Sequence, residues 1–117
     1  MATGFGLDVH AFGGDPPLLL CGVVVDPKRG LAGTSDADVG AHAVADALLG
    51  AAALGDIGAH FPSSSGEYAG ADSMELLARV VEMVEARSFA VNHIDLTIVA
   101  QSVRVAPHRD RMRENLA

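Results

Sequence analysis

The spacing of apolar residues near the start of the chain predicts short strands. Phe5 to His10 alternates apolar side chains with small or polar ones, which is the period expected of an extended strand. Leu18-Leu19-Leu20 and Val23-Val24-Val25 are apolar runs of strand length, and the turn-forming residues 26–30 follow them. The start of the chain is therefore expected to supply strands and tight turns.

The same alternation returns from Val91 to Gln101, which we expect to form a further strand. One face of this strand carries only apolar side chains, and the opposite face carries a mixed set. The two predicted faces are Ile94, Leu96, Ile98 and Ala100 on one side and Asp95, Thr97 and Val99 on the other.

Between these stretches the sequence has the signature of a helix. Ser35 and Asp38 resemble a capping box, and a run rich in alanine and leucine continues to about Leu54. Gly55 is a suitable stop signal for this helix. Residues 56–70 are rich in Gly, Ser and Pro, which predicts a long loop, and long ordered loops in small domains are often functional.

A second helix is predicted to begin at Asp72 or Ser73, either of which can cap it, and to continue to about Ala86. We expect it to cover a sheet with its apolar residues, which are Met74, Leu77, Val80, Val81 and Val84. Pro107 suits the first turn of a terminal helix. In that helix, Met112 and Leu116 are predicted to face inward, opposite Arg109, Arg111 and Arg113.

The order of elements predicts an α+β (mixed α/β) domain with helices packed on one face of a small mixed sheet. No repeat or linker interrupts the sequence, so residues 1–117 are expected to form a single domain. The net charge of −7 argues against a nucleic-acid binder, and no apolar stretch is long enough to span a membrane. Cys21 has no second cysteine to pair with, so we expect a cytoplasmic protein.

Three residues have the chemistry of zinc ligands. If Phe5 to His10 is a strand, Asp8 and His10 point to the same side while Val9 turns into the core. His42 lies in the first predicted helix among alanines, which allow another element to approach closely. Zinc at a reaction centre usually takes three protein ligands from His, Asp and Glu and leaves a fourth position open. Asp8, His10 and His42 therefore predict an open zinc site.

Each of these residues also has an interpretation without a metal. Asp8 and His10 can be two polar residues on the solvent face of a strand. His42 can be a half-buried histidine that is hydrogen-bonded to Asp38 or Asp46 on the same side of its helix. His42 can be both a zinc ligand and hydrogen-bonded to one of these aspartates, because a zinc-bound imidazole usually donates its second ring N–H to a carboxylate or carbonyl.

Other motifs carry weaker signals. Gly4-Phe5-Gly6 lacks the third glycine of a dinucleotide-binding loop and precedes a strand rather than a helix, which excludes that function. Residues 56–65 combine backbone donors, hydroxyls and a carboxylate, which suits polyol or phosphate oxygens, but an ordinary solvated loop has the same composition. Arg104 is either a phosphate ligand or a solvating surface charge.

Longer motifs resemble those of a known enzyme family, the 2-C-methyl-D-erythritol 2,4-cyclodiphosphate synthases. The similar segments follow the family's order and cover nearly the whole chain. They are Asp8-Val9-His10-Ala11-Phe12, Ser35-Asp36-Ala37-Asp38-Val39 with His42, the run from Asp46 to Gly58, Gly70-Ala71-Asp72-Ser73, and the stretch from Ile98 to His108.

The resemblance implies a homotrimeric enzyme of non-mevalonate isoprenoid biosynthesis, with an active site at each subunit interface. Its reaction would cyclise 4-diphosphocytidyl-2-C-methyl-D-erythritol 2-phosphate to 2-C-methyl-D-erythritol 2,4-cyclodiphosphate and release CMP. The resemblance implies Asp8, His10 and His42 as ligands of Zn²⁺. It also implies a second divalent cation, Mg²⁺ or Mn²⁺, that spans the α- and β-phosphates of the substrate.

By position, the resemblance also implies which residues contact the substrate. Asp56 and Gly58 would lie beside the erythritol hydroxyls, Phe61 to Ser65 would form a further substrate loop, and Ala100 to Ala106 would line the cytidine pocket of the adjoining subunit. The full implied set is Asp8, His10, Thr34, Ser35, Asp56, Ile57, Gly58, Phe61, Pro62, Ser63, Ser64, Ser65, Ala100, Gln101, Ser102, Val103, Arg104, Val105 and Ala106.

The chain departs from the family's pattern at several points. Thr34 occupies the position of a histidine thought to stabilise the transition state, and a hydroxyl carries no positive charge. Ser63 replaces an acidic residue, whereas Arg104 keeps the charge of the usual lysine. The family continues past Ala117 into a strand and a Thr/Glu-containing segment, so we expect a domain that lacks this segment.

These departures leave two alternative functions open. The first is a trimeric metal-binding relative that keeps the zinc site but has no turnover. The second is a zinc-dependent phosphohydrolase that uses metal-bound water, although no general base is evident near its ligands.

Overall fold

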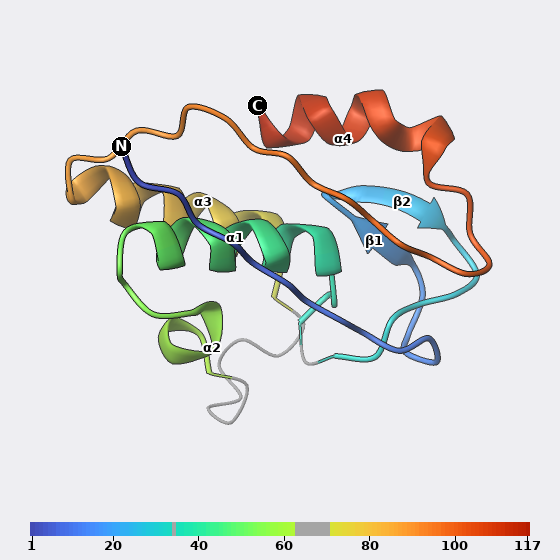
Figure 1. Ribbon diagram of the computed structural model, residues 1–117. Coiled ribbons are helices and arrows are strands. Elements are labelled where there is room, and N and C mark those ends of the chain that lie inside the picture. Colours follow the sequence, from blue (N-terminus) through green and yellow to red (C-terminus); the bar gives the residue numbers. More distant parts are fainter. Residues whose placement is uncertain (34, 63–70) are drawn as a thin grey trace.

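The computed structural model describes residues 1–33, 35–62 and 71–117 (Figure 1). Two strands come first along these ranges and the helices follow them, which confirms the α+β class. In chain order the elements are β1 (Leu18–Leu20), β2 (Val23–Asp26), α1 (Val39–Ala51), α2 (Ile57–His60), α3 (Ser73–Ala86), the 3-10 helix η2 (Ala106–His108) and α4 (Arg109–Leu116).

The two long helices begin at aspartate caps. Asp38 caps α1 by accepting a hydrogen bond from the backbone N–H of Ala41, and Asp72 caps α3 through the N–H of Met74. The predicted cap at Asp72 is confirmed. The capping box predicted from Ser35 is wrong, because the Asp38 side chain is itself the cap of α1 and the helix begins only at Val39.

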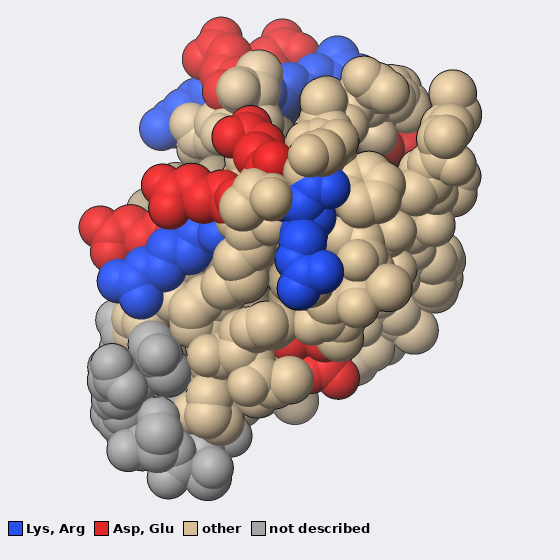
Figure 2. Space-filling model, turned by 90° about the vertical axis from the view of Figure 1, so that its left-hand side faces the viewer, with Lys and Arg blue, Asp and Glu red and all other residues tan. Residues whose placement is uncertain are grey.

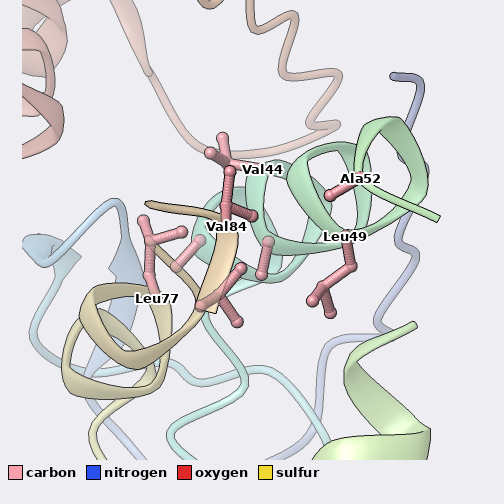
Figure 3. Close-up of a cluster of buried hydrophobic side chains, with 8 residues drawn as sticks. Val44, Leu49, Ala52, Leu77 and Val84 are labelled. Atoms are coloured by element: carbon pink, nitrogen blue, oxygen red, sulfur yellow. The ribbon is translucent and has the colours of Figure 1, made fainter. Parts of the chain in front are cut away.

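The larger hydrophobic cluster lies between α1 and α3, so α3 packs mainly on a helix rather than covering a sheet as predicted. Figure 3 shows Val44 and Leu49 of α1 near Leu77 and Val84 of α3. Leu49 and Val80 are completely buried. Buried alanines on α1 present only methyl groups at this interface, which lets the two helices pack closely.

Leu49→Ala is expected to lower the free energy of unfolding by about 2–5 kcal/mol, because it leaves a cavity between α1 and α3. Urea unfolding followed by circular dichroism measures the change. Leu7→Ala is the matched control, because Leu7 is 72% exposed and its truncation should change stability by less than about 0.5 kcal/mol. Equal losses in the two variants would contradict this description of the core.

The sheet of the described residues is an antiparallel hairpin of β1 and β2, smaller than the mixed sheet predicted. Cys21 and Gly22 form its two-residue turn, and both have positive φ, at 50° and 75°, as a type I′ turn requires. Leu18, Leu20 and Val23 form a second cluster with Met112 of α4, which faces inward as predicted.

The segments predicted as strands at 5–10 and 91–101 belong to no strand of the described sheet. Their alternation is nevertheless real: along 94–100, even-numbered residues are partly buried and odd-numbered ones are exposed. No neighbouring strand pairs with either segment among the described residues, so both lack the ladder hydrogen bonds that define a strand.

The inward face of the N-terminal segment is the opposite of the one predicted. Val9 is 80% exposed rather than in the core, whereas Asp8 and His10 are partly buried. The reason lies in Gly4 and Gly6, because a Cβ at either position would overlap a backbone carbonyl oxygen of α1. The inward face therefore holds glycines and ligands, and the segment runs closely along α1 (Figure 1).

The segment after α1 also differs from the prediction. The helix ends at Ala51 instead of near Leu54, and Ala53 and Gly55 then adopt positive φ. The predicted loop 56–70 begins with the short helix α2, which Asp56 caps through the backbone N–H of Ala59.

Figure 2 shows Lys and Arg side chains interspersed with Asp and Glu on one face of the molecule. No described helix has the length and apolar character to cross a membrane.

Candidate metal centre

Asp8, His10 and His42 converge on one point, as the sequence predicted. Asp8 Oδ2 lies 2.8 Å from His10 Nε2 and 3.1 Å from His42 Nδ1. One donor atom from each of the three residues lies within 4.8 Å of the other two. The N-terminal segment supplies Asp8 and His10, and α1 supplies His42, so the close packing of this segment on α1 assembles the group.

Both imidazoles are held by their outer nitrogens. His10 Nδ1 donates to the carbonyl oxygen of Ala32 at 2.6 Å, and His42 Nε2 is hydrogen-bonded to Ser73 Oγ at 2.7 Å. Ser35 Oγ lies 3.2 Å from the same nitrogen of His42. Each ring is thus hydrogen-bonded on its outer nitrogen and has its other nitrogen directed at Asp8, which is the arrangement found around metal-bound histidines.

The donor set fits a zinc ion. Zinc in proteins binds His nitrogens and carboxylate oxygens at about 2.0–2.2 Å, so tetrahedral ligands lie about 3.4 Å apart. The contacts of Asp8 Oδ2 with the two imidazoles, at 2.8 and 3.1 Å, are about 0.6 and 0.3 Å shorter than this separation, and all three donor atoms lie within 4.8 Å of one another. Carboxylate and imidazole are also the ligand types that zinc prefers at reaction centres.

The charges of the three residues support one another. Burial acts to raise the pKa of Asp8, but its hydrogen bond to His42 and the nearby charges of His10 and His42 lower it overall. Burial acts to lower the pKa of His42, but the hydrogen bond to Asp8 and its charge, with those of Asp38 and Asp36, raise it overall. The site thus favours an ionised carboxylate and attracts positive charge.

The carboxylates expected to orient His42 have other partners. Asp38 Oδ1 accepts the backbone N–H groups of Cys21 and Ala41, and its Oδ2 accepts the N–H of Gly22. Asp46 Oδ1 accepts the N–H of Ile57 at 2.7 Å. The prediction that either side chain is hydrogen-bonded to the His42 ring is therefore wrong, because both carboxylates accept backbone N–H groups instead.

Sequence reasoning missed Ser73 as the residue that holds His42, and it missed Asp36 behind it. Asp36 accepts hydrogen bonds from both the backbone N–H and the hydroxyl of Ser73. Both residues lie in motifs that carried the family resemblance. That membership was the available signal, because 31 positions separate Ser73 from His42 and helical spacing cannot relate residues so far apart.

The tripeptide Asp56-Ile57-Gly58 has a fixed backbone. Asp46 holds the N–H of Ile57, and Asp56 caps α2. Asp56 and Gly58 are exposed and available to a ligand, whereas Ile57 is partly buried. Of the other implied substrate residues near this helix, Phe61 packs against the larger cluster and Pro62 is partly buried. Thr34 and residues 63–65 lie outside the described residues.

Asp46→Ala is expected to loosen this tripeptide, because the backbone N–H of Ile57 loses its carboxylate acceptor. The amide of Ile57 should exchange with solvent faster, and stability should fall by about 1–3 kcal/mol. Hydrogen exchange followed by NMR measures the first effect and urea unfolding the second. Asp95→Ala is the control, because the exposed Asp95 should give neither change; unchanged Ile57 exchange in Asp46→Ala would contradict the assigned contact.

The implied nucleotide segment and two of the candidate metal ligands, Asp8 and His10, line the same groove. Residues 100–106 lead into η2, and Arg29 anchors the segment by donating to Ser102 Oγ at 2.8 Å. Its partly buried members are Ala100, Val103 and Val105, and its exposed members are Gln101, Ser102, Arg104 and Ala106. The groove encloses about 970 Å³, and its lining includes Asp8 and His10 as well as Ala100, Gln101 and Val103.

Comparison with known proteins relates the whole chain to one family. The model of the YgbB family matches residues 1–117. A 2-C-methyl-D-erythritol 2,4-cyclodiphosphate synthase of Idiomarina loihiensis is 53% identical over 115 residues, which are 98% of this chain and 72% of that protein. One of Salinibacter ruber is 54% identical over 117 residues, which are 100% of this chain and 74% of that protein.

Solved structures agree with this relationship. The bifunctional IspDF from Campylobacter jejuni is 44% identical and superposes with a TM-score of 0.96, covering 99% of this chain and 31% of that one. A CDP-bound 2C-methyl-D-erythritol-2,4-cyclodiphosphate synthase is 32% identical with a TM-score of 0.80, covering 97% of this chain and 76% of that one. The chain is therefore a member of the YgbB family, which confirms the relationship to the 2-C-methyl-D-erythritol 2,4-cyclodiphosphate synthases that its motifs predicted.

Proposed function

We propose that the protein is a phosphorus–oxygen lyase of non-mevalonate isoprenoid biosynthesis. It cyclises 4-diphosphocytidyl-2-C-methyl-D-erythritol 2-phosphate to 2-C-methyl-D-erythritol 2,4-cyclodiphosphate and releases CMP. The observation that carries this proposal is the convergence of Asp8, His10 and His42, with both imidazoles anchored from behind, in a chain about half identical to synthases of that name.

Asp8, His10 and His42 are proposed to bind Zn²⁺, and a second divalent cation, Mg²⁺ or Mn²⁺, is proposed to bind with the substrate diphosphate. When bound, these cations neutralise phosphate charge and orient the reacting groups. The outer hydrogen bonds of His10 and His42 hold the ligands ready, so ligand ordering costs less when the metal binds.

The reaction joins two phosphate groups of the same molecule. An oxygen of the 2-phosphate forms a bond to the β-phosphorus, and the bond from that phosphorus to the oxygen it shares with the α-phosphorus breaks, which frees CMP. Because both groups belong to one substrate, positioning contributes strongly, with an upper scale of about 7–11 kcal/mol. The fixed tripeptide 56–58, with Asp56 and Gly58 exposed, is proposed to supply part of that positioning at the erythritol hydroxyls.

The other substrate contacts are proposed from the family's pattern. Residues 100–106 would hold the cytidine. A solved relative with bound CDP supports a cytidine nucleotide as the class of ligand. Thr34, Ser35 and residues 61–65 would contact the phosphates and the sugar chain, with Thr34 as the candidate stabiliser of the transition state. We further propose a cytoplasmic homotrimer in which the adjoining subunit supplies the cytidine contacts.

A single assay tests the proposal. The protein is incubated with the cytidyl substrate, Zn²⁺ and Mg²⁺, and ³¹P NMR identifies the products. CMP together with the cyclic diphosphate is the expected result. CMP with a linear product would indicate a metal-dependent phosphohydrolase instead. Zinc binding without any product would indicate the metal-binding relative without turnover. In that case, the replacement of the usual histidine by Thr34 would account for the lost activity.

A further inference from the structure

Ser73 and Asp36 form a hydrogen-bonded pair behind His42. Ser73 is the first residue of α3, is almost fully buried, and places its hydroxyl oxygen 2.7 Å from His42 Nε2. Asp36 Oδ2 accepts the backbone N–H of Ser73 at 3.0 Å, and Asp36 Oδ1 accepts the hydroxyl proton of Ser73. A chain of contacts thus runs from Asp36 through Ser73 and His42 to Asp8.

The direction of each hydrogen bond in this chain is determined by Asp36. An ionised carboxylate can only accept, so the single hydroxyl proton of Ser73 is committed to Asp36. The oxygen of Ser73 can then only accept from His42, which requires the imidazole proton to be on Nε2. In the neutral imidazole this leaves the lone pair on Nδ1, the nitrogen 3.1 Å from Asp8 Oδ2, where it is available to a metal.

The geometry points to Asp36 and Ser73 as positioning residues that fix the tautomer and orientation of His42 for metal binding. This inference rests on the proposed function only in taking Asp8, His10 and His42 as zinc ligands. Partners of this kind behind metal-bound histidines typically change metal affinity by about 10–100-fold when they are removed. The same pair joins the residues before α1 to the start of α3, since Asp36 also donates its backbone N–H to the carbonyl oxygen of Ala71.

The test measures zinc affinity without substrate, by titration calorimetry on the full chain. Ser73→Ala is expected to weaken zinc binding by about 10–100-fold. Asp36→Asn should also weaken it, because an amide group facing Ser73 donates a hydrogen bond and frees the hydroxyl proton to point at His42 Nε2. Circular dichroism establishes that both variants are folded before they are compared.

Asp72→Ala is the matched control. It removes the cap of α3 next to Ser73 but leaves the contact with His42 in place, so zinc affinity should stay within about threefold of the wild type. If the role of Ser73 were only to start the helix, Ser73→Ala and Asp72→Ala would weaken zinc binding equally, and that result would overturn the inference.

NMR provides a readout that a purely structural role would not change. In the zinc-loaded protein, the Nε2–H proton of His42 should exchange slowly because Ser73 accepts it at 2.7 Å, and in Ser73→Ala it should exchange faster, because the remaining hydroxyl, that of Ser35, lies farther away at 3.2 Å. A protein that binds zinc but shows no effect of Ser73→Ala overturns this inference alone. A protein that shows the effect but forms no cyclic product supports the inference and contradicts the proposed activity.

Discussion

Asp38→Ala is expected to lower the free energy of unfolding by roughly 3 kcal/mol or more, because one substitution leaves three backbone donors without their acceptor. The Asp38 side chain is completely buried and accepts the N–H groups of Cys21, Gly22 and Ala41 at 2.7–3.0 Å. Its carboxylate therefore both starts α1 and holds the turn between β1 and β2. Chemical unfolding in urea, followed by circular dichroism, measures the loss.

Asp72→Ala provides the comparison, because Asp72 also caps a long helix but is exposed and, among the residues that the structure describes, accepts one backbone N–H, that of Met74. Its removal should cost about 1 kcal/mol. Asp38→Asn should fall between the two, since an amide keeps one acceptor oxygen but offers N–H groups where the other oxygen was. Similar stabilities for Asp38→Ala and Asp72→Ala would show that Asp38 acts only as an ordinary cap.

His42→Ala is expected to abolish zinc binding at micromolar metal and, with it, cyclisation of the substrate. It removes a ligand rather than a supporting group, so zinc affinity should fall by more than the roughly 10–100-fold typical of outer partners. Two ligands would remain on the N-terminal segment with nothing on α1 to close the site. Calorimetry and the zinc content of the purified protein measure the effect.

His93→Ala is the histidine control for this prediction, because His93 is exposed and lies outside the group of metal ligands. It should keep both zinc binding and activity. A His42→Ala protein that still binds zinc with wild-type affinity would refute the assigned site, and one that still cyclises its substrate would refute the mechanism proposed for it.

Local patterns predicted the helices α1, α3 and α4 and the three candidate metal ligands of this protein. The start of α3 at Asp72 and the inward side of α4 follow from spacing and caps, which depend on neighbouring residues only. The pairing of Asp8 with His10 follows from the two-residue period of an extended chain. His42 was included in the predicted zinc site because histidine is a common zinc ligand, and the structure places it beside Asp8 and His10.

The wrong predictions concern side chains whose position or hydrogen-bond partner depends on residues far away in the sequence. Periodicity shows that Asp8 and Val9 face opposite ways, but the contact with α1 decides which of them is inside. Asp38 was expected at His42 because it lies four positions away on the helix, yet the turn at Cys21 occupies its carboxylate. The contact of Ser73 with His42 depends on how α1 packs on α3, which no local pattern specifies.

Gly4 and Gly6 have a consequence for how this site can vary. Neither carries a donor atom, but any larger side chain at these positions would push the segment bearing Asp8 and His10 away from α1 and from His42. The positions most sensitive to mutation therefore include two where the ligand chemistry is unaffected. Engineering that grafts only the three ligands onto another helix would reproduce the chemistry but lose the spacing that these glycines impose.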